Sequence, residues 1–296
     1  MTAITDLFEA ERPALTALCY RMLGERAAAE DVVQETWLRL SHADAARLGN
    51  PRAWLRRVAT NIAIDTLRSA RARRETYVGP WLPEPLIEAT GAPAEDAFIL
   101  AQECQLALLW AMERLDPVER AAFVLREAFD AGYDEISACL GKSEAACRQM
   151  VSRAHKRLQN SGPRFDVQPE ELSQQLGLFL QAAATGDHAT AKAILSDQAV
   201  AISDGGAKAR AARRALNGPD EIVQVFAAAW AKTSSTPYTR TAIGRANGMP
   251  ALLHFREGQL ETVTQIIPDN SGRIGWIYVM RNPDKLAAYS AASILS

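Results

Sequence analysis

Hydrophobic residues recur every three to four positions through the first quarter of the chain, the spacing of one face of an α-helix. The spacing predicts a helix that ends at Gly24, a second over 29–40, and a third that starts after Asn50-Pro51. Each helix keeps a polar face opposite its apolar stripe. We therefore expect an all-α domain over residues 1–75.

The helical pattern breaks over residues 76–97. Three prolines within six positions exclude a helix interior, so this segment is predicted to be an extended linker. Its apolar residues indicate that the linker is docked on another part of the protein. Helices resume over 98–160, where two short helices are joined by a turn at Gly141-Lys142, which predicts a helix-turn-helix in a second all-α domain.

The pattern changes again over residues 168–290. Helical spacing comes first, and runs rich in β-branched and aromatic residues follow, the last of them after a turn at Asp269 to Gly272. Helices followed by an antiparallel meander predict an α+β domain. The predicted helices cover 170–184, 188–195 and 220–231, and the predicted strands cover 237–245, 250–257, 260–268 and 273–281.

Charge is distributed unevenly, although the net charge is only −2. Residues 1–44 carry four arginines and eight acidic residues, whereas residues 47–74 carry eight arginines and one acidic residue, Asp65. A basic surface of this density is typical of nucleic-acid binding. The neighbouring acidic surface would repel DNA, so it favours a basic protein partner.

No window reaches the roughly 18 apolar residues that a membrane helix needs, and the acidic N-terminus does not resemble a signal peptide. The four cysteines, at 19, 104, 139 and 147, lie on apolar stripes and form no CxxC pair. They are predicted to be small buried hydrophobic residues instead of disulfides or metal ligands. We expect a cytoplasmic protein with no membrane contact, metal or cofactor.

The N-terminal half resembles the extracytoplasmic-function (ECF) sigma factors. Residues 29–40, AEDVVQETWLRL, resemble region 2.2, which docks on core RNA polymerase. Residues 51–68, PRAWLRRVATNIAIDTLR, resemble regions 2.3 and 2.4, which open the −10 element, and residues 115–158 resemble region 4. The resemblance implies two all-α sigma domains, with core polymerase and promoter DNA as partners.

This resemblance and the exposed faces of the predicted helices together select three sets of residues. The set expected to bind core polymerase is Asp31, Gln34, Glu35 and Leu38. The set expected at the −10 element is Arg52, Arg56, Arg57, Asn61 and Arg68, with Arg71, Arg73 and Arg74 as further phosphate contacts and helix capping as the alternative for Asn61. The set expected at the −35 element is Lys142, Ser143, Arg148, Gln149, Ser152, Arg153 and Lys156, where Ser143 is also the expected N-cap.

The C-terminal part resembles the SnoaL-like fold, a cone-shaped α+β domain, and the chain resembles the SigJ-like group of ECF sigma factors that carry it. Three short segments hold this likeness: WLPEPL at 81–86, DGGAK at 204–208 and NPDKL at 282–286. Ala207 replaces a glycine that is usual there, which is strained only if its φ is positive. The residues expected to make regulatory contacts between domains are Trp81, Pro83, Asp204, Gly205, Gly206, Lys208, Asn282, Pro283, Asp284, Lys285 and Leu286.

The C-terminal domain leaves two hypotheses open. It regulates the sigma domains within the same chain, including through a small ligand in its cavity, or it is an enzyme of the cyclase or isomerase type. In the second case His254 and Asp204 are the candidate catalytic residues. For the whole chain, the competing interpretation is a helix-turn-helix regulator that senses a ligand. The regulatory hypothesis is preferred because no acid–base pair is visible in the sequence.

Overall fold

The computed structural model describes residues 2–43, 48–88, 104–159, 169–233 and 238–294. The chain forms two compact units. The first contains Met1–Glu75 and Leu109–Gly162, and the second contains Thr76–Pro93 and Pro163–Ser296. The described part of the predicted linker, residues 76–88, therefore belongs to the same unit as the C-terminal domain.

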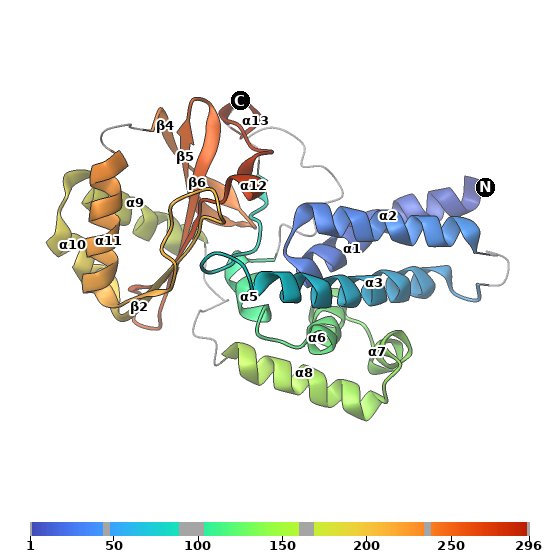
Figure 1. Cartoon of the computed structure of the whole chain (residues 1–296). Helices are drawn as coiled ribbons and strands as arrows, with labels where there is room; N and C mark the ends of the chain where they lie inside the picture. Colours follow the sequence, from blue (N-terminus) through green and yellow to red (C-terminus); the bar gives the residue numbers. More distant parts are fainter. Residues whose placement is uncertain (1, 44–47, 89–103, 160–168, 234–237, 295–296) are drawn as a thin grey trace. The chain divides into compact units, whose positions relative to one another are not determined.

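The described part of the first unit is helical, as expected (Figure 1). α1, α2 and α3 pack against one another, α6 packs on α1, α3 and α8, and α7 packs on α3 and α8. The helices in this half of the chain are α1 (Thr2–Leu23), α2 (Arg26–His42), α3 (Pro51–Arg74), α5 (Leu106–Met112), α6 (Pro117–Phe129), α7 (Tyr133–Leu140) and α8 (Glu144–Gln159).

Side-chain caps fix where several of these helices begin. The Asn50 side chain accepts a hydrogen bond from Ala53 N (3.1 Å), and Asp116 accepts one from Val118 N (2.9 Å). Ser143 Oγ accepts a hydrogen bond from Ala146 N (3.2 Å), so its predicted role as the N-cap of α8 is confirmed. Gly141 has a φ of +62°, which lets the chain turn between α7 and α8.

All four cysteines are free and buried, as the prediction of small hydrophobic residues required. Burial raises the pKa of the Cys19, Cys104 and Cys139 thiols, because a thiolate is poorly solvated in the core. These thiols are therefore protonated and unreactive at neutral pH. No helix in the described ranges combines the length and the apolar character needed to cross a membrane.

The second unit is built on a seven-stranded sheet in the order β1-β4-β5-β6-β7-β2-β3. β4 to β7 form the predicted antiparallel meander, and β2 joins it parallel to β7. The α+β class is thus confirmed. The strands are β1 (Ile87–Glu88), β2 (Leu195–Asp204), β3 (Leu216–Asn217), β4 (Arg240–Ala246), β5 (Met249–Arg256), β6 (Gln259–Pro268) and β7 (Ile274–Met280).

Helices cover the sheet. α9 packs on β5 and β6, α11 packs on β2, and α10 lies against both helices (Figure 1). Small helices complete the C-terminal end of the unit, where α12 lies against β6. The helices of this unit are α9 (Pro169–Thr185), α10 (His188–Ala193), α11 (Gly218–Thr233), α12 (Pro283–Leu286) and α13 (Ala291–Ile294).

The linker adds a strand to this sheet, which sequence reasoning did not predict. It runs extended through the proline-rich segment, as expected, and then β1 pairs antiparallel with β4, with Ile87 opposite Ala246. β4 and β5 are joined by Asn247-Gly248, whose φ values are +50° and +74°. Asn-Gly with two positive φ values is the usual composition of a tight hairpin turn.

Candidate functional site

The residues expected to bind core polymerase lie on one face of α2. Asp31, Gln34 and Leu38 are exposed and Glu35 is half-buried, while the opposite face of the helix is buried in the first unit. Leu38 leaves 45% of its surface exposed, so it offers an apolar contact beside the acidic residues. Glu35 pairs with Arg39 of its own helix (2.9 Å). The face is therefore acidic, with one exposed apolar side chain, Leu38, at its C-terminal end.

Four of the five residues expected at the −10 element are exposed along α3: Arg52, Arg57, Asn61 and Arg68. Asn61 lies in the middle of the helix, so the capping alternative for this residue is wrong. Arg52 pairs with Glu11 and Arg68 pairs with Asp65; both arginines stay more than half exposed, although Glu11 is only 16% exposed. An exposed ion pair such as that of Arg68 contributes little, so a phosphate can replace it.

Arg56 differs from its neighbours because it contacts α7. Its Nη1 lies 2.5 Å from Glu135 Oε1, and its guanidinium lies 5.8 Å from the centre of the Phe129 ring. Its side chain is 27% exposed. A DNA contact by Arg56 therefore requires the ion pair with Glu135 to break first.

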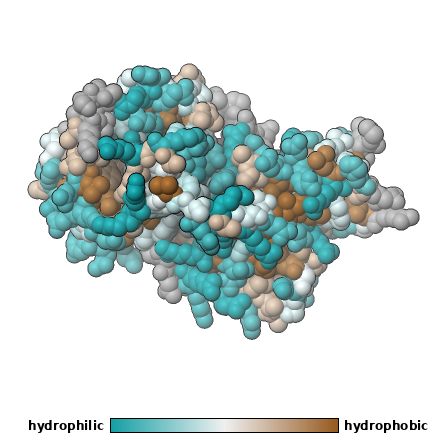
Figure 2. All heavy atoms as spheres, in the orientation of Figure 1, coloured by the Kyte–Doolittle hydropathy of each residue, from teal (hydrophilic) through white to brown (hydrophobic). Residues whose placement is uncertain are grey.

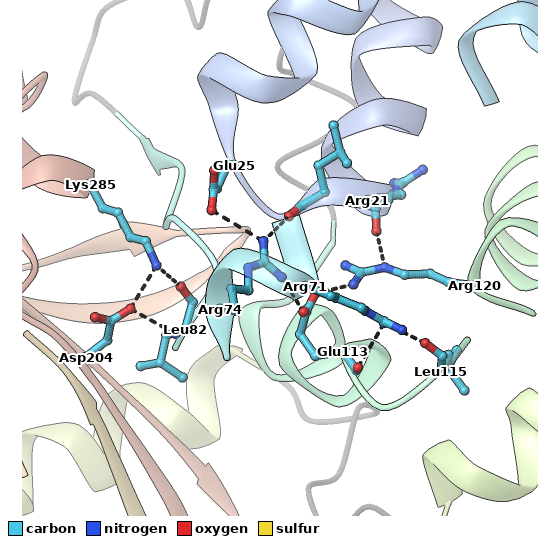
Figure 3. Close-up of polar contacts among 11 residues, drawn as sticks. Arg21, Glu25, Arg71, Arg74, Leu82, Glu113, Leu115, Arg120, Asp204 and Lys285 are labelled. Carbon is cyan, nitrogen blue, oxygen red and sulfur yellow. Dashed lines mark hydrogen bonds and ion pairs between the residues drawn. The ribbon is translucent and has the colours of Figure 1, made fainter. Parts of the chain in front are cut away.

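Arg71 and Arg74 do not fit their predicted role as phosphate contacts. Arg71 Nη2 donates hydrogen bonds to the carbonyl oxygens of Glu113 (2.9 Å) and Leu115 (2.5 Å). Arg74 forms ion pairs with the carboxylates of Glu113 and Glu25 (Figure 3). Both arginines hold the C-terminal end of α3 against the segment before α6, so the structure corrects this part of the prediction.

The same carboxylate also binds Arg120, whose side chain is fully buried. Arg120 Nη1 pairs with Glu113, and its Nε donates to the carbonyl oxygen of Arg21 (2.9 Å; Figure 3). Burial alone would raise the pKa of Glu113, but the charges of Arg120, Arg74 and Arg71 outweigh burial and hold it below its ordinary value. One carboxylate thus pairs with two arginines inside the first unit, and a third arginine lies near it.

The residues expected at the −35 element share the exposed surface of the helix-turn-helix. All of them have exposed side chains, and none is drawn into the core. Arg148 pairs with Glu144 (2.7 Å), and Arg153 pairs with Glu119 (3.2 Å) while it stays 58% exposed. The exposed set is Lys142, Ser143, Arg148, Gln149, Ser152, Arg153 and Lys156.

In the second unit Asp204 is fully buried and binds the linker. Its carboxylate accepts hydrogen bonds from Tyr77 Oη (2.6 Å), from Leu82 N (2.9 Å) and from Lys285 Nζ (2.8 Å; Figure 3). Lys285 also donates to the carbonyl oxygen of Leu82, and its ammonium group lies 4.3 Å from the centre of the Trp81 ring. We call Asp204, Lys285, Tyr77 and Leu82 the linker clamp.

Asn282 and the glycines beside Asp204 complete this arrangement. Asn282 Nδ2 donates to Tyr77 Oη (2.8 Å), and its Oδ1 caps α12. Gly206 has a φ of +56°, and a Cβ there would lie 2.8 Å from the Asn282 side chain, so this position requires glycine. Ala207 has no positive φ, so it is not strained. The structure therefore brings together the three segments that the sequence analysis selected.

The remaining residues of those segments lie around the clamp. Pro83 and Leu286 are buried, and Lys208 pairs with Asp284 at the surface. Gly205 faces the backbone of Ala209, where a Cβ would approach the carbonyl oxygen to 2.3 Å. Pro283 occupies the first turn of α12.

Sequence reasoning missed further residues that hold the linker. Asn247 is fully buried; its Oδ1 accepts from Leu86 N (3.0 Å) and its N donates to Leu86 O (2.9 Å). Tyr289 Oη donates to the carbonyl oxygen of Pro85 (3.1 Å). The Asn247-Gly248 turn was readable in the sequence, but nothing local indicated that its side chain binds a segment 161 residues away.

A cavity of about 1270 Å³ lies in the second unit and is lined by residues of the sheet, α9 and α11. His254 lines it and is 5% exposed, its Nδ1 lies 3.0 Å from Thr241 Oγ1, and its ring stacks on Tyr238 with centroids 4.4 Å apart. Asp204 does not line the cavity. Its carboxylate binds Tyr77, Leu82 and Lys285 in the linker clamp instead. The two candidate catalytic residues are therefore not brought to one site.

Burial lowers the pKa of His254 to about 4; the Glu261 carboxylate opposes this shift and the charge of Arg281 adds to it, and the ring is neutral at pH 7. Between pH 6.5 and 4 the unfolded chain takes up a proton that the folded chain does not, so stability falls as the pH falls. The shift corresponds to a loss of about 3 kcal/mol across this window. We expect His254→Gln to flatten this dependence in urea unfolding measured from pH 4 to 7; an unchanged slope would contradict the assignment.

Comparisons with known proteins extend this picture. Residues 7–73 match the family described as Sigma-70 region 2, and residues 105–158 match Sigma-70, region 4. The chain is 40% identical to the ECF RNA polymerase sigma factor SigJ of Mycobacterium tuberculosis over 73% of its own length and 70% of that protein. It is 31% identical to the probable ECF RNA polymerase sigma factor SigI of the same species over 96% and 94%. The crystal structure of M. tuberculosis SigJ matches with a TM-score of 0.77 at 30% identity, covering 96% of this chain and 98% of that one.

Proposed function

The chain belongs to the family of ECF RNA polymerase sigma factors, and from this premise we propose how its surfaces share the work of promoter recognition. The acidic face of α2 binds core RNA polymerase, α3 binds the −10 element, and α8 binds the −35 element. The observation that carries the proposal is the exposure of three separate faces on one unit, one acidic and two rich in arginine or lysine. A regulator with only a helix-turn-helix would not need the first two.

The chemistry of strand opening fits α3. Pulling a base out of a duplex costs a few kcal/mol, which contacts to the displaced strand must offset. Arg52, Arg57 and Arg68 supply exposed cations for phosphates, and Asn61 offers both a donor and an acceptor to a base edge.

The chemistry of duplex reading fits α8. A major groove admits one helix, and arginine and glutamine make bidentate hydrogen bonds to guanine and adenine. Arg148, Gln149 and Arg153 are exposed on that helix, and Lys156 lies near them for phosphates. Ser143 caps the helix, so a base contact by its hydroxyl is secondary.

The double variant Asp31→Lys, Glu35→Lys tests the polymerase surface. We expect it to bind purified core polymerase at least about tenfold more weakly, because two attractive charges become repulsive at the interface. Both residues lie outside the core, so circular dichroism should show an unchanged fold. The control is Glu9→Lys, Arg12→Glu, which inverts an exposed ion pair on α1. Core binding equal to that of the parent would place the interface elsewhere.

Arg153→Ala tests the −35 surface. We expect a loss of about 1–3 kcal/mol in promoter binding together with relaxed sequence preference at one position, since a base contact is removed. Lys156→Ala is the matched comparison and should weaken binding to all sequences alike, with a smaller salt dependence. Binding of promoter variants across a salt series measures both effects, and a uniform loss for Arg153→Ala would make it a phosphate contact.

For the C-terminal domain we propose regulation of the sigma domains within the same chain instead of catalysis. Its support is the linker clamp: residues 77–88 are bound to this domain through Asp204, Lys285 and β1, so they are not available as free linker. Release of the clamp lengthens the tether between the two DNA-binding regions, which biases how far they can separate. Run-off transcription by Lys285→Met at equal core occupancy tests this role, and a yield equal to that of the parent would contradict it.

A further inference from the structure

The cavity of the second unit has an apolar wall that neither the proposed promoter binding nor the linker clamp uses. The wall comes mainly from α9, α11 and the sheet, and Figure 2 shows hydrophobic side chains at the surface over α11. The volume of about 1270 Å³ exceeds the roughly 300–1,000 Å³ of most small-molecule sites, so a small ligand would fill only part of the cavity. The larger apolar residues of the lining are Phe179, Ile222, Val223, Phe226, Leu252 and Val279.

Two arginines line the same cavity and share one carboxylate. Arg256 Nε lies 2.6 Å from Glu261 Oε2, and Arg281 Nη2 lies 3.2 Å from Glu261 Oε1. All three side chains are only 26–31% exposed. Glu261 is the one acidic residue among the described lining residues, and Lys208 and Arg210 line the cavity as well. With His254 neutral, the lining carries an excess of positive charge.

The hydrogen bonds of Arg281 leave one buried donor without an acceptor. Nη1 donates to the carbonyl oxygen of Arg210 (2.7 Å) and Nη2 donates to Glu261, but Nε is buried and has no partner among the described residues. A buried donor without an acceptor is unfavourable, and such groups are rare in folded proteins. An acceptor supplied by a bound molecule would satisfy it.

The aromatic rings beside the arginines provide a flat surface. Tyr238 stacks on His254 with an interplanar angle of 19°, and the guanidinium of Arg256 lies 5.1 Å from the centre of the Tyr238 ring. Thr262 and Thr264 of β6 also line the cavity. The cavity therefore has an apolar end against the helices and a cationic, polar end on the sheet.

We propose that this cavity binds a small amphipathic anion, a carboxylate on an aromatic or aliphatic body. The carboxylate is bound by Arg281 and Arg256, and the body lies against the apolar residues of α9 and α11. A neutral ligand of the same shape would leave the excess positive charge uncompensated, and a cation would be repelled by it. Ligand binding does not depend on promoter recognition, so this proposal stands independently of the sigma-factor surfaces.

The anion site adjoins the linker clamp along the backbone. Arg281 N donates to the carbonyl oxygen of Asp204 (2.7 Å). The next residue, Asn282, donates to Tyr77 of the linker clamp. Lys208 lines the cavity and also pairs with Asp284. A ligand on Arg281 thus lies one residue from the segment that binds the linker.

Isothermal titration of the full-length protein with two pairs of probes tests the proposal. The pairs are 2-naphthoate with 2-naphthylmethanol, and octanoate with octanol. We expect at least one anion to bind at a single site with a Kd below about 1 mM, and its neutral partner to bind at least about tenfold more weakly. Arg281→Met and Arg256→Met should each weaken binding of the anion at least about tenfold, which corresponds to the loss of a charged hydrogen bond.

Arg273→Met is the matched control, because Arg273 pairs with Asp197 at the surface and does not line the cavity. It should bind the anion as the parent does. Two arginine variants are used so that a folding defect in one, detected by circular dichroism, leaves the other to decide. The proposal is overturned if neither anion saturates below about 1 mM, if the alcohol binds as tightly as its acid, or if a folded arginine variant binds like the parent.

Discussion

Lys285→Met should lower the free energy of unfolding of the second unit by about 3–5 kcal/mol, because it leaves the carboxylate of Asp204 buried without its cationic partner. Asp204 is fully buried and the Lys285 side chain is 9% exposed, so water cannot replace the ion pair. The Tyr77 and Leu82 contacts to Asp204 should weaken with it. Urea unfolding measures the loss, and hydrogen exchange should rise first over residues 77–88.

Lys208→Met is the control for this variant. Lys208 pairs with Asp284 in the neighbouring segments, but both side chains are more than 60% exposed. An exposed pair of this kind contributes about 0–1 kcal/mol, so this variant should keep the linker protected. Equal stability of Lys285→Met and Lys208→Met would mean that the clamp does not hold the linker. Chymotrypsin cleavage after Tyr77 or Trp81 gives a second measure of release.

Glu113→Gln should destabilise the first unit by a comparable amount, about 3–5 kcal/mol, because the Glu113 carboxylate is the partner of two largely buried arginines, Arg74 and Arg120. Arg120 is fully buried and Arg74 is 13% exposed, so neither can turn to solvent when its partner loses its charge. Hydrogen exchange should increase at the C-terminal end of α3 and at the start of α6. Urea unfolding followed by circular dichroism measures the total effect.

Glu30→Gln is the matched substitution at the surface. Glu30 pairs with Arg26 on α2 at 3.1 Å and is 51% exposed, so its loss should cost well under 1 kcal/mol. Because the pKa of Glu113 lies below its ordinary value, its contribution is present above the pKa of the unfolded state and is lost as the pH falls through the folded value. The free energy of unfolding of the parent should therefore fall on acidification. If it stays constant although Glu113→Gln is destabilised, the charge argument is contradicted.

Local periodicity predicted the helices and the meander well, because each depends on residues a few positions apart. The stripe over 29–40 is buried as expected, and the meander strands begin and end within a few residues of the predicted bounds. Periodicity also fixes which side chains share a face of α3. It does not reveal what covers that face. For this reason the sequence predicts phosphate contacts for Arg71 and Arg74, whereas in the structure both bind the segment before α6.

The linker clamp also depends on contacts that a local sequence pattern cannot predict. The structure brings together the segments at 81–86, 204–208 and 282–286 that carry the resemblance, while their regulatory role stays a prediction. Their contacts join residues more than 80 positions apart, so no local pattern distinguishes a clamp aspartate from a catalytic one. Burial separates the two roles: Asp204 has no exposed surface, and its acceptors are already used by the linker.

The pairing of β1 with β4 has a consequence for the released form of the linker. β1 is the strand at one edge of the sheet, and it pairs with Arg245 and Ala246 of β4. When the linker leaves, these backbone groups lose their hydrogen-bond partners, and the apolar side chains of Leu82, Leu86 and Ile87, all buried in the docked state, become exposed with them. An uncovered strand edge beside an apolar segment readily accepts a strand from another chain. We therefore expect the form with a released linker to be prone to aggregation. It should persist only where another polypeptide or surface pairs with the exposed edge of β4.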